Sequence, residues 1–370
     1  MTRITQIFFE LVKAGLWGNG NLDIRIDGTT EWQEIYRLAT EQSVLGLVLT
    51  GLEYSAVKPP QIVLLQWIGE VQMIEQRNKA MNTFIADLME KMRKEDIYSL
   101  LVKGQGIAQC YDRPLWRASG DVDFFLSDEN YEKAKEFLIP RASSVEPEGV
   151  YGMHLGMTIE GWVVELHGHL YSGLSSRVEK ELDRLQEDSF YGGQVRSWMN
   201  GKTQVFLLAA ENDAFYVFTH ILQHFYKGGI GLRQICDWCR LLWTYRETLD
   251  HEYLESKIKK AGLMTEWKAF GAFAVEYLGM PLDAMPFYSA DQRWKKKAVK
   301  ICSFILEVGN FGHNRDNSYF QKHSYFVQKC ISARCRVKDL CRHARIFPLN
   351  SLRFFFGIMY NGIVSTLRGE

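Results

Sequence analysis

The chain has 370 residues, of which 46% are hydrophobic and 13% aromatic, proportions typical of a folded protein with a substantial core. Its 44 basic and 44 acidic residues cancel, which excludes a uniformly basic surface for nucleic acid. Seven cysteines, an odd number spread along the chain, argue against a disulfide framework. No signal-peptide pattern is recognised, so we expect a cytoplasmic protein.

The first hundred residues have helical patterns. Apolar residues recur at helical spacing over residues 4–16 and 31–42. After Pro59 and Pro60, residues 61–96 contain one glycine and no proline, which predicts one or two long helices. Residues 1–96 are therefore expected to form an N-terminal helical region.

The pattern changes at residue 97. Short segments then alternate: a strand at 97–104, a helix at 106–111, a strand at 121–127, a helix at 128–138, and a hairpin of 154–160 and 162–170 joined at Gly161. This succession predicts an α+β fold, in which a small mixed sheet over residues 97–200 lies between two helical regions.

Helical patterns return after residue 200, in 203–225 and 232–245. We expect a C-terminal helical domain over 201–310 and a basic, aromatic helical tail over 311–370. Residues 329–353 contain seven Lys and Arg residues but only one acidic residue, and an apolar aromatic run follows. The basic stretch is either a solvated helix face or a patch for an anionic membrane surface or an acidic acceptor.

Three carboxylates are the strongest sign of chemistry. Asp121 and Asp123 begin an apolar strand and point to one face, where their mutual repulsion favours a bound cation such as Mg²⁺. Glu165 lies in a second apolar strand and shares a face with His167. If these strands are neighbours, the carboxylates converge as a two-metal phosphoryl-transfer site requires. A separation above about 6 Å between Glu165 and both aspartates would argue against that site.

Residues before the first aspartate suit a phosphate. Lys103 and Gly104 end the preceding strand, and Gly104 with Gly106 lets the backbone come close to an anion. Arg117 offers a charge-assisted contact a few residues upstream of Asp121.

The segments LVKGQGIAQCY, LWRASGDVDFFLS and VVELHGHL resemble the uncharacterised bacterial nucleotidyltransferase family of the DNA-polymerase-β-like superfamily. The similarity covers roughly residues 30–245. It implies a minimal nucleotidyltransferase fold, in which Asp121, Asp123 and Glu165 bind metal and carry the catalysis. The superfamily pattern has a serine where Gln105 follows Gly104, and this departure weakens the expected hold on phosphate.

The resemblance also implies nucleotide-binding residues: Lys103, Gly104, Arg117, Gly120, His224 and Arg233. His220 and His224 have the i, i+4 spacing of zinc ligands, but no third ligand is evident, which favours a structural or substrate-facing role. Asp237 is expected to orient Arg233 or to support a helix contact.

Two further groups have less specific patterns. Cys236 and Cys239 form a CxxC without a second one, and we interpret them as buried thiols. His167 is interpreted either as ordering Glu165 or contacting substrate, or as a satisfied strand histidine.

Two functions follow as hypotheses. The first is a Mg²⁺-dependent nucleotidyltransferase with two ions, which moves a nucleoside monophosphate from an NTP to a metabolite, polysaccharide precursor, protein or RNA and releases pyrophosphate. The alternative is a non-catalytic nucleotide-binding or scaffold protein. The balanced charge argues against DNA as a partner, whereas RNA and peripheral membrane contact by the tail stay open.

Overall fold

The computed structural model describes residues 1–18, 22, 26, 28–149, 153–309 and 325–367. Its N-terminal part consists of α1 (Arg3–Trp17), α2 (Thr29–Glu41), α3 (Leu45–Leu52) and α4 (Gln61–Arg93). Thr2 caps α1 by accepting a hydrogen bond from Thr5, and Gly18, with φ at 64°, ends it. The predicted long stretch is a single helix, α4, of 33 residues and roughly 50 Å.

A five-stranded mixed sheet follows, in the order β1-β2-β5-β4-β3. Its strands are β1 (Ser99–Val102), β2 (Val122–Leu126), β3 (Ser144–Val145), β4 (His154–Ile159) and β5 (Trp162–His167). Only β2 and β5 pair in parallel; the other pairs are antiparallel. The coarse prediction, a small mixed sheet in a largely helical chain, is confirmed, and β4 and β5 form the predicted hairpin.

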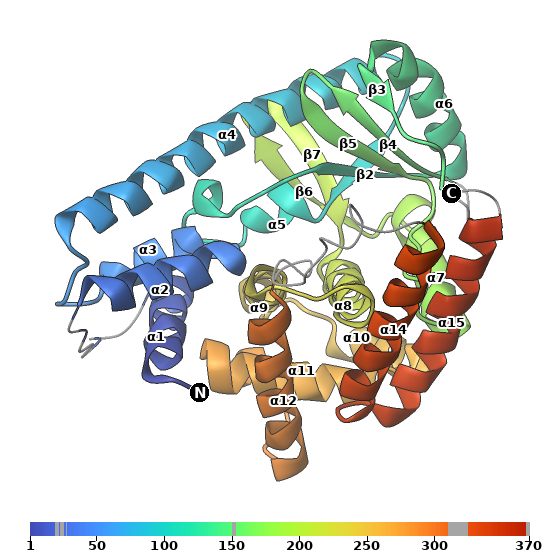
Figure 1. The fold of residues 1–370 in the computed structure, drawn as a ribbon. Helices are drawn as coiled ribbons and strands as arrows, with labels where there is room; N and C mark the ends of the chain where they lie inside the picture. Colours follow the sequence, from blue (N-terminus) through green and yellow to red (C-terminus); the bar gives the residue numbers. More distant parts are fainter. Residues whose placement is uncertain (19–21, 23–25, 27, 150–152, 310–324, 368–370) are drawn as a thin grey trace.

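The two faces of the sheet have different neighbours. Val122, Phe124 and Leu126 pack with apolar residues of α4 and of α6 (Asp128–Leu138) on one side. Because side chains alternate along a strand, Asp123 and Phe125 point to the opposite side, where Phe125 contacts Phe190. In Figure 1, α4 runs along one side of the sheet and the later helices gather on the other. The acidic face of the sheet therefore looks toward these later helices.

The segment after residue 200 corrects one prediction. The helix expected over 203–225 begins as a strand, β7 (Thr203–Leu208), which pairs with β6 (Val195–Asn200) around a turn at Gly201, and only then continues as α8 (Ala210–Lys227). Thr203 and Val205 are buried while Gln204 between them is exposed, an alternation typical of a half-covered strand. Neither β6 nor the preceding helix α7 (Ser176–Phe190) was predicted.

The remaining elements of the described chain are helices. They are α9 (Leu232–Tyr245), α10 (His251–Ala261), α11 (Met264–Leu278), α12 (Gln292–Val308), α14 (Tyr325–Ala344) and α15 (Pro348–Leu367). Short helices complete the fold: α5 (Gly104–Ala108) and the 3₁₀ turns η1 (Pro114–Trp116), η2 (Ile139–Arg141) and η3 (Leu282–Ala284). One apolar core joins α1 to α8, α9, α11 and α12, so the N-terminal and C-terminal helices pack together.

Cys236 and Cys239 are fully buried in α9, which confirms their interpretation as buried thiols. In the basic stretch, Arg334, Lys338, Arg345 and Arg353 are exposed, while the side chains of Lys329 and Arg336 lie outside the described ones. Across the described part of the chain, no helix combines the length and the apolar character that crossing a lipid bilayer requires.

Candidate functional site

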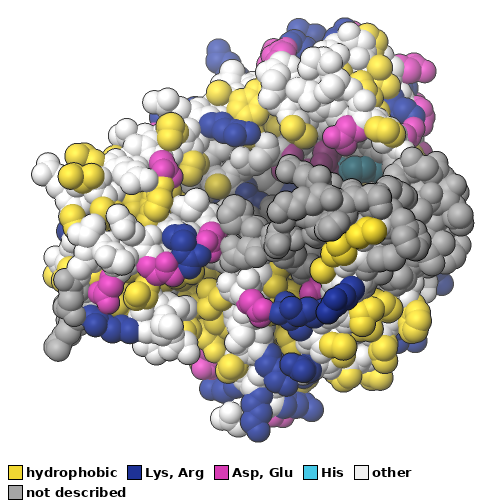
Figure 2. Space-filling model, viewed as in Figure 1, with side chains coloured by type: hydrophobic (Ala, Val, Ile, Leu, Met, Phe, Trp, Pro, Cys, Tyr) yellow, Lys and Arg dark blue, Asp and Glu magenta, His cyan; other side chains and the backbone are white. Residues whose placement is uncertain are grey.

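A cleft of about 510 Å³ separates the acidic face of the sheet from α8 and α9. This volume is in the range of small-molecule sites. All nine residues predicted as site residues line it: Lys103, Gly104, Arg117, Gly120, Asp121, Asp123, Glu165, His224 and Arg233. Figure 2 shows acidic and histidine side chains together at a hollow in the surface. The structure thus gathers these residues, and their individual roles stay predictions.

The three carboxylates converge on the floor of the cleft. Asp123 pairs in register with Glu165 across the parallel strands β2 and β5, so both side chains stand on the same face. Asp121 lies just before β2. Each of the three offers an oxygen within 4.8 Å of the other two, well inside the separation of about 6 Å that would have argued against a shared cation.

The carboxylates differ in electrostatic environment. The Asp123 side chain is 2% exposed, and burial alone would raise its pKa, but Lys103 and His167 hold the pKa below the ordinary value. Hydrogen bonds from His154 and His167 lower the pKa of Glu165. Desolvation, with repulsion from Asp123, raises the pKa of Asp121. Asp123 and Glu165 therefore stay ionised most readily, whereas the repulsion from Asp123 helps to raise the pKa of Asp121.

Lys103 contacts a carboxylate. Its Nζ lies 2.7 Å from Asp123 Oδ1, and this attraction raises the pKa of the amine despite its burial. The backbone of Lys103 has φ at 57° and ψ at −146°, a conformation that costs a non-glycine residue roughly 1–3 kcal/mol. The strained turn brings the ammonium group to Asp123. The predicted role of Lys103 is a phosphate contact. For that contact the ammonium group must either bind Asp123 and the phosphate together or move away from Asp123.

Two histidines complete the acidic cluster. His167 Nε2 lies 2.9 Å from Asp123 Oδ1 and 3.5 Å from Glu165 Oε2. Burial opposes its protonation, but these two carboxylates raise the pKa of His167 overall. His167 thus contacts both acids, which fits an ordering role as well as a satisfied strand histidine, so its role stays a prediction.

His154 was missed by the sequence analysis. Its Nε2 lies 3.3 Å from Glu165 Oε2, and it pairs with His167 in the β4–β5 register. Ile159 pairs with Trp162 around the turn at Gly161, and counting back from that turn places residue 154 opposite residue 167. The hairpin pattern therefore contained the signal.

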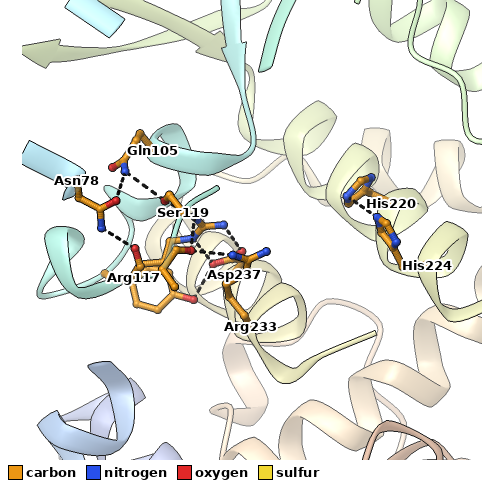
Figure 3. Close-up of polar contacts among 10 residues, drawn as sticks. Asn78, Gln105, Arg117, Ser119, His220, His224, Arg233 and Asp237 are labelled. Atoms are coloured by element: carbon orange, nitrogen blue, oxygen red, sulfur yellow. Dashed lines mark hydrogen bonds and ion pairs between the residues drawn. The ribbon is translucent and has the colours of Figure 1, made fainter. Parts of the chain in front are cut away.

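Gln105, at the position where the superfamily pattern has serine, points away from the cleft (Figure 3). It is 1% exposed, and its Nε2 donates to Asn78 Oδ1 at 2.8 Å and to Ser119 Oγ at 3.1 Å. Asn78 on α4 in turn donates to the carbonyl oxygens of Leu115 and Arg117. Gln105 therefore fastens the loop before Asp121 to α4.

Asp237 orients Arg117, which corrects the prediction that it orients Arg233. Arg117 Nε and Nη2 donate to the two oxygens of Asp237 at 2.8 and 2.7 Å, and both side chains are nearly buried. Tyr111 adds a hydrogen bond to the same carboxylate. Arg233 instead donates from Nη1 to Ala118 O, and its buried Nε has no hydrogen-bond partner among the described residues. Arg117 thus makes a two-point contact with Asp237 through Nε and Nη2 (Figure 3). This bidentate geometry favours Arg117 over Arg233 as the partner of Asp237.

His220 and His224 lie one helical turn apart on α8, with their Nε2 atoms 3.0 Å from each other (Figure 3). Both line the cleft. Among the described residues, no third metal-ligating side chain joins them, and the structural or substrate-facing role of the two histidines stays a prediction. Burial lowers the pKa of both rings, that of His224 to about 4, so this wall of the cleft is uncharged near neutral pH.

The low pKa of His224 predicts a loss of stability in acid. As the pH falls below about 6.5, the unfolded chain binds a proton at this residue before the folded protein does, which favours unfolding. Between pH 7 and pH 4.5 the wild type should lose about 2 kcal/mol more unfolding free energy than His224→Gln. Denaturant titrations of both proteins at the two pH values measure this difference. An equal loss would show that His224 is protonated in the folded state.

Comparison with known proteins adds one finding. A family model described as an uncharacterised nucleotidyltransferase matches residues 28–279, more than half of the chain. The match runs from α2 to the end of α11 and includes the whole sheet and every residue of the cleft named above. No curated protein and no solved structure matches the chain significantly.

Proposed function

Since the chain belongs to this uncharacterised nucleotidyltransferase family, we propose that it transfers a nucleoside monophosphate from an NTP to an acceptor and releases pyrophosphate. The observation that carries the proposal is the convergence of Asp121, Asp123 and Glu165 in a cleft of suitable size. The small mixed sheet with its acidic pair at the start of β2 supports a polymerase-β-like arrangement as part of the same proposal.

The acidic cluster fits Mg²⁺. Its donors are hard carboxylate oxygens close enough to share an ion, and they open into the cleft. Asp121, Asp123 and Glu165 would hold two ions, which when bound neutralise the triphosphate and acidify the acceptor hydroxyl. Lys103 and His167 each place a nitrogen next to Asp123, so their positive charge lies where bound metal ions would also balance this carboxylate.

The phosphate end of the cleft is positively charged. Two arginines, Arg117 and Arg233, line this end. Asp237 neutralises Arg117, so the charge of Arg233 leaves a net positive charge facing the cleft beside the carboxylates. The buried Nε of Arg233 keeps a donor for an anionic oxygen. Gly120 has open space around its Cα, so the backbone next to Asp121 leaves room for a phosphate. We propose that the triphosphate binds at this end.

The opposite wall suits an uncharged group. Tyr216, His220 and His224 line it, and burial raises the pKa of Tyr216 to about 12, so all three are neutral near pH 7. Ring faces and neutral ring nitrogens can stack on and hydrogen-bond to a nucleoside or an acceptor. We place the non-phosphate part of a substrate here. A metabolite, polysaccharide precursor, protein or RNA remains the proposed acceptor, and the exposed basic residues of α14 offer a contact for an acidic one.

Ligand-dependent unfolding tests the proposal. Thermal unfolding is measured with each of the four NTPs, with and without Mg²⁺. At a hundred times its dissociation constant, a bound NTP should add about 2.7 kcal/mol of stability and raise Tm by a few degrees, and only with Mg²⁺. The nucleotide that acts can then be used with a labelled α-phosphate to find the acceptor. No shift with any NTP would favour the scaffold form of the non-catalytic alternative, because a nucleotide-binding protein would also be stabilised by its ligand.

A further inference from the structure

Glu165 belongs to a second cluster, which contains two imidazoles. Glu165 Oε2 lies 3.3 Å from His154 Nε2 and 3.5 Å from His167 Nε2, and each of the three residues offers a ligand atom within 4.8 Å of the other two. His154 and His167 pair across β4 and β5, and Glu165 is two residues before His167, so all three stand on one face of the sheet. The strand register itself thus assembles the group.

The spacing of these atoms fits a tetrahedral transition metal. Zn²⁺ binds imidazole nitrogen and carboxylate oxygen at 2.0–2.2 Å, which separates neighbouring ligand atoms by roughly 3.3–3.6 Å. The two measured distances to Glu165 Oε2, 3.3 and 3.5 Å, correspond to two edges of such a tetrahedron. Mg²⁺ prefers six oxygen ligands in octahedral geometry, so two nitrogen donors disfavour it.

We propose that His154, Glu165 and His167 form a binding site for a transition-metal dication of the Zn²⁺ class, separate in ligand chemistry from the all-carboxylate cluster. Two histidines and one glutamate are a donor set of catalytic zinc sites, which keep a fourth position open. The three residues line the cleft, and the His154 side chain is 45% exposed, so an ion has a path of entry. Metal binding at these residues is a property beyond the proposed nucleotidyl transfer.

Binding replaces existing hydrogen bonds. His167 Nε2 contacts Asp123 Oδ1 at 2.9 Å, and a ligating imidazole must present a lone pair at this nitrogen, so the ion displaces the proton that bridges the two residues. Lys103 remains beside Asp123 and balances its charge. Because Glu165 serves both clusters, an ion at the histidines also changes the ligands left for Mg²⁺ at Asp121 and Asp123.

Metal titration of variants tests this site. Zn²⁺ affinity is measured by competition with a chromophoric chelator, and Co²⁺ absorption reports the geometry. Exposed Cys335 and Cys341 are replaced by serine in every protein, so that their thiols do not bind the probe. We expect His154→Ala to weaken Zn²⁺ binding roughly tenfold or more, whereas the matched variant Asp121→Asn retains it. A large excess of Mg²⁺ should not displace the Zn²⁺.

Two outcomes would overturn the proposal: a His154→Ala protein that binds Zn²⁺ as tightly as the parent, or a Co²⁺ spectrum typical of octahedral coordination. His154 is half exposed at the start of β4, so its replacement leaves the core intact, and the unfolding temperature of the variant checks this. Failure of the nucleotide proposal is distinguishable, because it abolishes the Mg²⁺-dependent NTP shift while Zn²⁺ binding persists.

Discussion

The Asp121→Asn variant is expected to transfer nucleotide roughly a thousandfold more slowly than the wild type, equivalent to about 4 kcal/mol in the activation barrier. The change removes one of three carboxylates that would hold the ions against the triphosphate. Asp121 lies just before the strand and outside the apolar core, so the fold should tolerate the substitution. Transfer of label from an α-labelled NTP measures the rate, and the Mg²⁺-dependent rise in Tm should disappear with it.

A carboxylate on the β4–β5 hairpin, away from the cleft, provides the matched control. Glu160, at the turn between β4 and β5, has a side chain 62% exposed and lies far along the strands from Glu165. Glu160→Gln removes the same charge and should leave the rate within about twofold, since exposed charges away from the site act weakly through water. Asp121→Asn activity within tenfold of the wild type would reject the metal role of Asp121. Asp123→Asn is a poorer test, because it also removes the partner of Lys103.

Asp237→Ala is expected to lower the free energy of unfolding by roughly 3–5 kcal/mol. The substitution leaves the guanidinium of Arg117, whose side chain is only 6% exposed, without the carboxylate that accepts two of its hydrogen bonds. It also removes the acceptor of the Tyr111 hydroxyl. Denaturant unfolding measures the loss, and a weaker nucleotide-induced shift should accompany it because Arg117 lines the cleft.

A second arginine–aspartate pair separates burial from pairing. Arg240 contacts Asp112 at 2.7 Å with an equally buried guanidinium, but the Asp112 side chain is 66% exposed. Arg240 also donates to the carbonyl oxygens of Leu16 and Cys110, so it keeps partners after Asp112→Ala. This control should cost less than about 1 kcal/mol. If both substitutions cost the same, burial of Asp237 is not the source of its effect.

Local patterns predicted the elements with the clearest signals. The helix α4, the acidic start of α6 and the hairpin of β4 and β5 have strong periodicity and clear end signals, and all three were predicted. The segment 203–208 was predicted as helix because apolar residues run directly into those of α8. Its strand state depends on pairing with β6 and on packing against α4 and β1, contacts that a local pattern does not contain.

For the candidate site too, some features were predictable from the sequence and others depended on tertiary contacts. The sequence by itself determined that Asp121, Asp123 and Glu165 would meet if their strands were neighbours, because alternation along each strand orients the side chains. It also indicated the family, with which the match over residues 28–279 agrees, whereas the phosphate role of Lys103 and Gly104 stays a prediction.

Only the tertiary structure decided the partners of the charged groups. The sequence offered Asp237 its helical neighbour Arg233 or a helix contact, but the packing of the loop against α9 brought Arg117 to it from 120 residues away. The ion pair of Lys103 with Asp123 and the hydrogen bond of Gln105 to Asn78 on α4 also depend on this packing. Periodicity orients a side chain relative to its own element. Which charge it meets depends on how elements distant in the chain pack, since a buried charge requires a partner wherever the fold supplies one.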